Sequence, residues 1–140
     1  DGRHGELNDL VIKLSFYSFL AACFVSLVIY LNLEFLLGLL YKNSLMDYIG
    51  YSKMIIVCIP FYIVYLIIRN PQDALSIKPI NTYNLIGCFL LQLILLIITV
   101  NIVAVDKKIV LYHLSIIIPF VLLGLVSFIT WKRQIKKYLG

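Results

Sequence analysis

The chain has 140 residues, of which 62% are hydrophobic and 14% charged, and its mean hydropathy is +0.99. A water-soluble domain of this size would not tolerate so much apolar surface, so the composition excludes that class and predicts an integral membrane protein. The net charge of +5 is interpreted as a topology signal, with the basic Trp131–Tyr138 tail anchored at the interface beside anionic lipid. We therefore expect membrane lipids as partners and no nucleic acid.

Four apolar segments follow one another along the chain and predict an all-α fold. They cover residues 14–33, 50–68, 84–105 and 109–131. A helix needs about 20 residues to cross about 30 Å of hydrocarbon. The second segment reaches this length because Lys53 and Arg69 at its ends can extend their charges to the interface. The sequence predicts one transmembrane helical domain, residues 1–140, with four spans.

The first predicted helix continues beyond its membrane-spanning part. Between Asn8 and Tyr41 only Gly38 opposes helix formation. Such a helix is too long for the bilayer, so we expect it to project from the outer face or to bend at Leu33 and Glu34.

The connection between the second and third spans is unusually structured for a turn, and it covers residues 69–84. Pro71 disfavours helical geometry in the residue before it, so we expect it to end the second helix. Residues 73–77 are long enough for about one helical turn at the membrane surface. Asn81 or Thr82 is expected to cap the third helix by accepting hydrogen bonds from its free amides.

Small or polar side chains form one face on each of three spans. The faces are Ser18, Ala22 and Ser26; then Cys58, Tyr62, Tyr65 and Arg69; then Asn84, Cys88, Gln92 and Thr99. Two interpretations stay open: the faces hold helices together, or they line a substrate path, for which Asn84 and Gln92 are the strongest candidates. Pro60 and Pro119 lie inside the second and fourth spans, where proline can kink a helix.

The distribution of basic residues predicts that both termini are cytoplasmic. Four crossings place the two terminal segments and the loop after the second span on one side of the membrane. That side holds Arg3, Lys13, Arg69, Lys78, Lys132, Arg133, Lys136 and Lys137, and the other holds Lys42, Lys53, Lys107 and Lys108. The more basic side faces the cytoplasm by the positive-inside rule.

The residue types needed for catalysis or metal binding are not grouped in the sequence. Cys23, Cys58 and Cys88 lie one per span, and His4 and His113 are isolated. Paired carboxylates, nucleophile sets and phosphate-binding glycine motifs are also absent from the sequence. We predict no enzyme activity, no catalytic residues, no metal site and no cofactor.

Three segments of the chain resemble one transporter family. They are Leu36-Leu-Gly-Leu-Leu-Tyr-Lys-Asn-Ser44, Leu66-Ile-Ile-Arg-Asn-Pro-Gln-Asp-Ala-Leu75 and Lys78-Pro-Ile-Asn-Thr-Tyr-Asn-Leu-Ile-Gly87. In order and spacing they are similar to segments of the oligosaccharide flippases, within the multidrug, oligosaccharidyl-lipid and polysaccharide exporter superfamily. The specific part of the resemblance is residues 69–87.

The resemblance implies a function and a location. Such flippases sit in the bacterial inner membrane and move undecaprenyl-diphosphate-linked oligosaccharides across it for polysaccharide or O-antigen biosynthesis. This chain would be the last four helices of the C-terminal bundle, a fragment of a larger transporter whose N-terminal bundle is its partner. The rival expectation is a small four-helix accessory or immunity-type protein that binds a membrane partner.

The resemblance also implies roles for the polar connection. Arg69 would lie at the cytoplasmic end of the second span, and ion pairs with Asp73 and Lys78 would close the inward-facing state. Arg69 and Lys78 could also meet the substrate diphosphate. For each residue a plainer role stays open: Arg69 reaches to the interface, Asp73 is solvated, and Asn81 only caps a helix.

Overall fold

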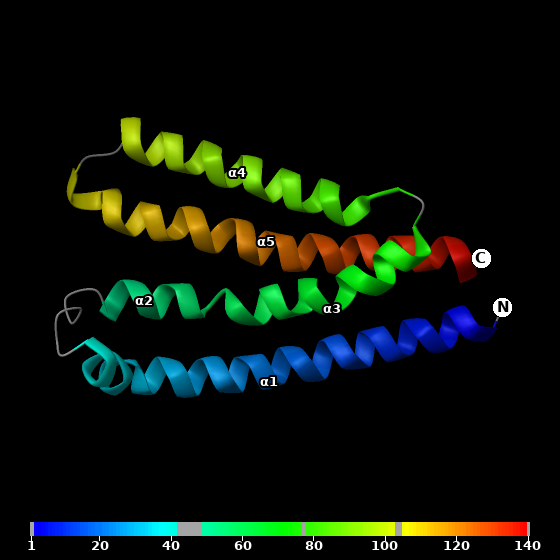
Figure 1. Ribbon diagram of the computed structural model, residues 1–140. Coiled ribbons are helices and arrows are strands. Elements are labelled where there is room, and N and C mark those ends of the chain that lie inside the picture. Colours follow the sequence, from blue (N-terminus) through cyan, green and yellow to red (C-terminus); the bar gives the residue numbers. More distant parts are fainter. Residues whose placement is uncertain (1, 42–48, 77, 103–104, 140) are drawn as a thin grey trace.

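The computed structural model describes residues 2–41, 49–76, 78–102 and 105–139, and it consists of helices (Figure 1). The helices are α1 (Gly2–Tyr41), α2 (Ile49–Ile56), α3 (Ile59–Leu75), α4 (Ile80–Ile102) and α5 (Val105–Leu139). Lys42, Asn43 and Ser44 of the first segment used for the resemblance lie outside the described residues. So does Ile77, which lies between the second and third segments.

The described residues are helical, which confirms the predicted all-α fold, and four helical stretches are long and apolar enough to cross a membrane. They are Gly5–Leu40, Ile49–Leu75, Ile80–Asn101 and Val110–Lys137. The start of α1 and the end of α5 lie at the same end of the molecule, as four crossings require (Figure 1). That this end is cytoplasmic stays a prediction.

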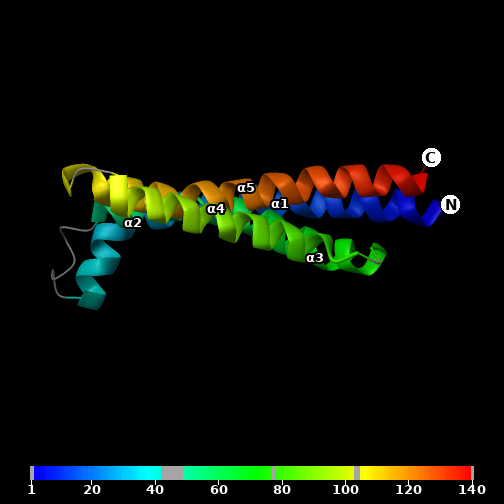
Figure 2. The ribbon, with the colours of Figure 1, turned by 90° about the horizontal axis from the view of Figure 1, so that it is seen from above.

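The four spans form an open layer of helices. In the layer α1 packs on α3, α3 on α5 and α5 on α4, so α1 and α4 are the two edges (Figure 1). Lesser contacts join α1 to α5 and α3 to α4. Seen from above, at the end that carries the termini, α3 and α4 are displaced to one face of the layer and α1 and α5 to the other (Figure 2). Only 6% of the apolar window of α4 is buried, so most of its surface is left to lipid or to another protein.

The second span is interrupted at Val57 and Cys58, which separate α2 from α3. The backbone amide of Val57 donates to the carbonyl oxygen of Met54, and the amide of Cys58 donates to that of Ile55. Each bond spans three residues instead of the four of an α-helix, so the helix is locally tighter here. Pro60 then occupies the first turn of α3, where its missing N–H is tolerated. Where a kink was expected at Pro60, the structure has an interruption between α2 and α3. At Pro119 the helix α5 continues without interruption.

The expectation that Pro71 ends the second helix is wrong. α3 runs through Pro71 to Leu75, because a proline near a helix end removes only one backbone hydrogen bond and the last turn has other support. The expected separate surface turn at residues 73–77 is therefore largely the end of α3 itself. The connection to α4 is reduced to residues 76–79.

The expected capping of the third span is also wrong. α4 begins at Ile80, and the Tyr83 amide bonds to the Pro79 carbonyl. Asn81 and Thr82 therefore lie inside the first turn rather than before it. The Thr82 side chain is exposed, and the Asn81 amide group points back to α3, where it makes the contacts described below.

The last turns of α1 leave the layer, and Figure 2 shows them directed away from the other helices. At this end Lys53 of α2 donates a hydrogen bond to the Glu34 carboxylate, with Nζ and Oε1 3.0 Å apart. The same ammonium group lies 5.3 Å from the ring centre of Tyr30. These contacts join α2 to α1 where α1 begins to diverge.

The most buried apolar cluster lies near the end that carries both termini. Ile68 and Trp131 are fully buried, and Val11 and Ile135 pack with them, so the cluster joins α1, α3 and α5. The expected interface role of Trp131 is therefore wrong. Three helices converge on its ring and shield it, which nothing in the local sequence indicates.

α3 and α5 approach each other closely at Gly124 of α5. A Cβ atom placed on Gly124 would lie within 3 Å of the backbone carbonyl carbon and oxygen of Phe61 in α3. Backbone atoms cannot rotate away as a flexible side chain can. Because Gly124 has no side-chain carbon, α3 and α5 can pack this closely, as small residues allow between membrane helices.

We predict that Gly124→Ala lowers the free energy of unfolding by about 1–3 kcal/mol, because α3 and α5 must move apart. Gly87→Ala in α4 is the matched control, since nothing lies within 4 Å of its added Cβ and alanine favours a helix. Denaturant unfolding in detergent, followed by Trp131 fluorescence, measures both. Equal stability of the two variants would contradict the close packing.

Candidate functional site

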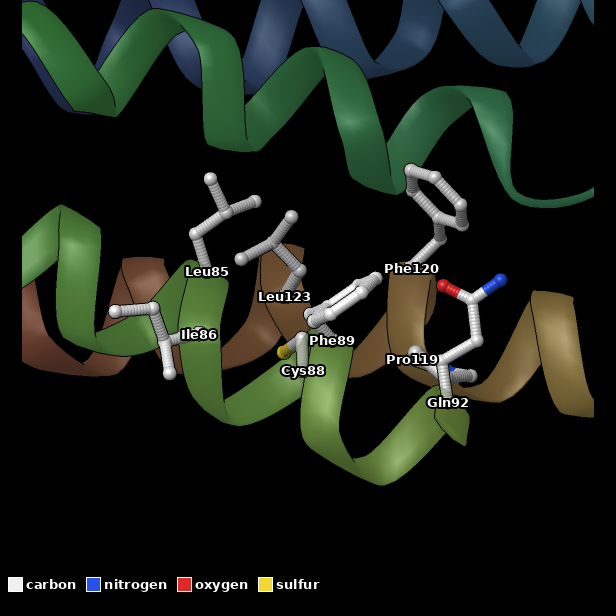
Figure 3. Close-up of a pocket in the computed structure, with 8 residues that line it drawn as sticks. All are labelled: Leu85, Ile86, Cys88, Phe89, Gln92, Pro119, Phe120 and Leu123. Carbon is white, nitrogen blue, oxygen red and sulfur yellow. The ribbon is translucent and has the colours of Figure 1, made fainter. Parts of the chain in front are cut away.

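The candidate site is a groove over α5, between α3 and α4. One part of it is a cavity of about 400 Å³ between α4 and α5 (Figure 3). Its lining consists of Leu85, Ile86, Cys88, Phe89, Gln92, Pro119, Phe120 and Leu123. Seven of these eight side chains carry no group that can form a strong hydrogen bond, so the cavity favours an apolar occupant.

A second cavity of about 330 Å³ lies against the same helix on the side of α2 and α3. It is lined by Ile55, Cys58, Ile59, Tyr62, Ile116 and Phe120. Phe120 borders both cavities, and its ring packs edge-on against Tyr62 with centroids 5.5 Å apart. Both cavities therefore lie against Phe120 of α5, one on the side of α4 and the other on the side of α2 and α3, and we call the two together the groove.

The polar faces predicted for the second and third spans each have residues on this groove. Cys58, directly before α3, and Tyr62 of α3 line it, and Tyr65 is buried. Arg69 at the end of the same face is exposed and lines neither cavity.

On α4, Cys88 and Gln92 line the groove (Figure 3), whereas Thr99 bonds to Leu95 of its own helix. Gln92 makes no hydrogen bond to any residue in the described ranges. Its amide is the main polar group of the apolar section. An unpaired amide at this depth is costly, which favours a partner or ligand for it.

Asn81 lies one helical turn before Leu85, on the side of the groove that is nearer the termini. Its side-chain nitrogen donates to the Arg69 carbonyl oxygen and to Asp73 Oδ1, each at 2.8 Å. Asn81 is buried, and both acceptors belong to the last turns of α3. We call these three residues the Asn81 clasp. It ties the beginning of α4 to the end of α3 across the short connection, and it supports the helical turn that follows Pro71.

A second set of hydrogen bonds lies next to the clasp and centres on Thr130 of α5. The Thr130 hydroxyl accepts from Gln72 Nε2 at 3.0 Å and from Asn84 Nδ2 at 3.3 Å. It donates to the Ser127 carbonyl oxygen at 3.0 Å. One hydroxyl group therefore connects three helices, and we call this set the Thr130 hub. Asn84, one of the predicted site residues, serves here to hold helices together.

Gln72, Thr130 and Gln134 are functional-site residues that the sequence reasoning missed. Gln72 is fully buried, and its carbonyl oxygen is 3.5 Å from Gln134 Nε2 of α5. Gln72 lies within the polar connection, so its position there was a usable signal. Thr130 and Gln134 lie next to or within the basic C-terminal segment, and their hydrogen-bond partners are distant in the sequence. The local sequence therefore contains no signal that would have identified them.

The ion pairs expected between Arg69, Asp73 and Lys78 are not formed. Within the described residues the ion pair is that of Lys53 with Glu34, which lies at the opposite end of the second span from Arg69. Asp73 instead accepts a hydrogen bond from Asn81, because the clasp brings that neutral amide to the carboxylate. Arg69 near the end of α3 and Lys78 in the connection to α4 are both exposed. Two cations are thus available there to an anionic group.

Cysteines and potential metal ligands are dispersed in the described part of the chain. Cys23, Cys58 and Cys88 are free thiols, and no three His, Cys, Asp or Glu side chains within the described ranges are close enough to hold a metal ion. The absence of a cofactor and of enzyme activity stays a prediction.

Comparisons with protein-family models, with curated proteins and with solved structures found no match for the chain. What the site does is therefore argued from its own residues.

We predict that Asn81→Ala loosens the end of α3. Losing two hydrogen bonds of about 1 kcal/mol each should raise hydrogen exchange in the last turn of α3 by roughly tenfold or more. The control is Asn101→Ala, on the same helix, whose exposed amide bonds only to Ile97 of its own helix. Exchange that is unchanged in Asn81→Ala would show that the clasp does not hold the connection.

We predict that Thr130→Val destabilises the protein by about 1–2 kcal/mol, because it keeps the shape but leaves the amides of Gln72 and Asn84 without their acceptor. Thr130→Ser retains the hydroxyl and should restore most of the loss. Unfolding in detergent measures all three proteins. A serine variant as unstable as the valine variant would assign the loss to packing instead of hydrogen bonding.

Proposed function

We propose that this chain is part of a flippase that translocates undecaprenyl-diphosphate-linked oligosaccharides across the bacterial inner membrane, for polysaccharide or O-antigen biosynthesis. The observation that carries the proposal is the Asn81 clasp beside the groove. Arg69, Asp73 and Asn81 belong to the segment that resembles the flippases, and their hydrogen bonds tie α3 to α4 one helical turn from Leu85, which lines the cavity between α4 and α5. A simple turn between two spans would not need these contacts.

The polarity of the groove supports the handling of an amphiphile. The two cavities beside Phe120 are apolar, and Arg69 near the end of α3 and Lys78 in the connection that follows it are exposed. A lipid diphosphate has the same division, with an apolar tail and a strongly anionic head. Guanidinium and ammonium groups are natural partners of phosphate oxygens. With the termini in the cytoplasm, the cations would meet the substrate on the side where it is made.

The open layer supports a partner on the exposed helices. α4 is an edge that packs mainly on α5, and Gln92 leaves an unpaired amide on the groove. An opposing N-terminal bundle would cover this surface and complete a two-sided transport path. The same observation favours the second candidate, an accessory or immunity-type protein that binds a membrane partner and transports nothing.

We predict that Arg69→Ala and Lys78→Ala, introduced into the native gene, each reduce translocation several-fold while the protein inserts normally. The expected signs are less surface polysaccharide and accumulation of the lipid-linked oligosaccharide in the cytoplasmic leaflet. Lys13→Ala is the control, since Lys13 is an exposed cation on α1, the opposite edge of the layer. Unchanged flux in both variants would remove the role of these cations.

Deletion of the whole gene separates the two candidate functions. A flippase deletion stops export of the oligosaccharide. An accessory or immunity-type protein would leave export intact and would instead be recovered in a stable complex with its membrane partner. Intact export after deletion would overturn the flippase proposal.

A further inference from the structure

We propose that a cavity at the break between α2 and α3 binds an uncharged, mainly apolar molecule that carries a hydroxyl group. The cavity has a volume of about 460 Å³. Residues of α1 line one side of it, and Ile56, Val57 and Pro60 at the break line the other (Figure 1). We call it the break cavity. The inference is independent of the flippase proposal, which rests on other residues.

The break leaves one backbone carbonyl without a donor. In a continuous helix the Ile56 carbonyl oxygen would accept from the residue four positions later, but that residue is Pro60, which has no N–H. No other amide in the described ranges bonds to this oxygen. Ile56 is the last residue of α2, and helix carbonyls point towards the C-terminal end, so the oxygen points into the break. The wall made by the break therefore offers a hydrogen-bond acceptor.

The α1 side of the break cavity offers a hydroxyl group without a partner. Ser26 lines the cavity and is only 7% exposed, and its Oγ forms no hydrogen bond within the described part of the chain. Serine inside a helix often donates to a carbonyl of the preceding turn, as Ser115 does to the Tyr112 carbonyl oxygen at 2.6 Å. Ser26 has not made this bond. Its hydroxyl group is left to donate to another molecule.

A ligand hydroxyl group satisfies both needs at once. It can accept a hydrogen bond from Ser26 Oγ and donate one to the Ile56 carbonyl oxygen, because a hydroxyl is a donor and an acceptor. Both protein groups lie inside a membrane span, where an unpaired polar group is costly. The pairing would therefore favour an apolar alcohol over a plain hydrocarbon of the same shape.

The rest of the lining selects an uncharged, apolar body. No carboxylate, ammonium or guanidinium group belongs to the described residues around the break cavity, so a charged ligand would lack a counter-ion in hydrocarbon. Phe19, Tyr30 and Phe61 contribute three aromatic rings. The volume falls within the range of about 300–1,000 Å³ that is typical of small-molecule sites.

A neighbouring cavity of about 220 Å³ provides a matched comparison. Ser15 of α1 lines it, and the Ser15 hydroxyl group is also buried and unpaired within the described residues. Phe19 and Phe61 border both cavities, and their rings pack edge-on with centroids 5.6 Å apart. The lining residues of this smaller cavity all lie within helices, so no helix break supplies an acceptor there. An apolar alcohol should therefore prefer the break cavity.

The test uses 3-azioctanol, an aliphatic alcohol that carries a photoreactive diazirine, and its methyl ether, which cannot donate a hydrogen bond. The full chain is labelled in nanodiscs, and the modified residues are located by mass spectrometry. We expect the alcohol to label residues 56–61 and the facing part of α1. The methyl ether should label them about fivefold less, the effect of losing one hydrogen bond.

Three variants test the two protein groups separately. Ser26→Ala removes the donor and should reduce labelling by the alcohol about fivefold, whereas Ser15→Ala should leave it unchanged. Pro60→Ala supplies an N–H for the Ile56 carbonyl oxygen, so it should also reduce labelling. The fluorescence of Trp131, the single and fully buried tryptophan, shows whether each variant has kept its fold.

Several outcomes would overturn the inference. Equal labelling by the alcohol and its methyl ether would mean ordinary lipid contact, and so would undiminished labelling of a folded Ser26→Ala protein. An equal loss in Ser15→Ala and Ser26→Ala would assign the effect to α1 as a whole. A disulfide between the Cys23 residues of two copies after mild oxidation, together with loss of labelling, would show that the cavity is a protein interface.

Discussion

The Thr130 hydroxyl is where three membrane helices meet through hydrogen bonds, and the arrangement around the groove depends on it. Gln72 is fully buried and Asn84 is half-buried between the helices, so their shared acceptor on α5 links α3 and α4 at one point. The Asn81 clasp adds a direct tie between α3 and α4. Together the hub and the clasp join α3, α4 and α5 on the side of the groove that is nearer the termini.

Hydrogen bonds and close packing stabilise the layer at different positions along the helices. Gly124 brings α5 against the Phe61 backbone of α3 near the middle of the spans, while the Trp131 cluster and the Thr130 hub join the helices near the termini. None of these contacts joins α1 to α4, so the layer does not close on itself. Both of its faces stay available, and this openness is the physical basis for proposing a second bundle or another membrane partner.

Much of the fold could be predicted from the sequence, because the bilayer imposes strong rules on length and hydropathy. The four spans followed from the length and hydropathy of the apolar segments, and the polar face from Cys58 to Arg69 followed from helical spacing. The structure places Cys58 and Tyr62 of that face on the groove. The failures occurred where distant residues decide a local outcome. Pro71 does not end α3, because the clasp supports the turn around it, and Trp131 is shielded by helices that the tail sequence does not contain.

The sequence by itself determined the membrane class, the number of spans and the stretch in which the polar groups of the candidate site lie, since these follow from local composition and helical spacing. Only the tertiary structure decided that the helices form an open layer, that Asn84 binds Thr130 while Gln92 is left on the groove, and that Asp73 pairs with Asn81 instead of Arg69. The reason is geometric. Whether a polar group in hydrocarbon holds helices together or remains free for a ligand depends on what another helix places within about 3 Å of it.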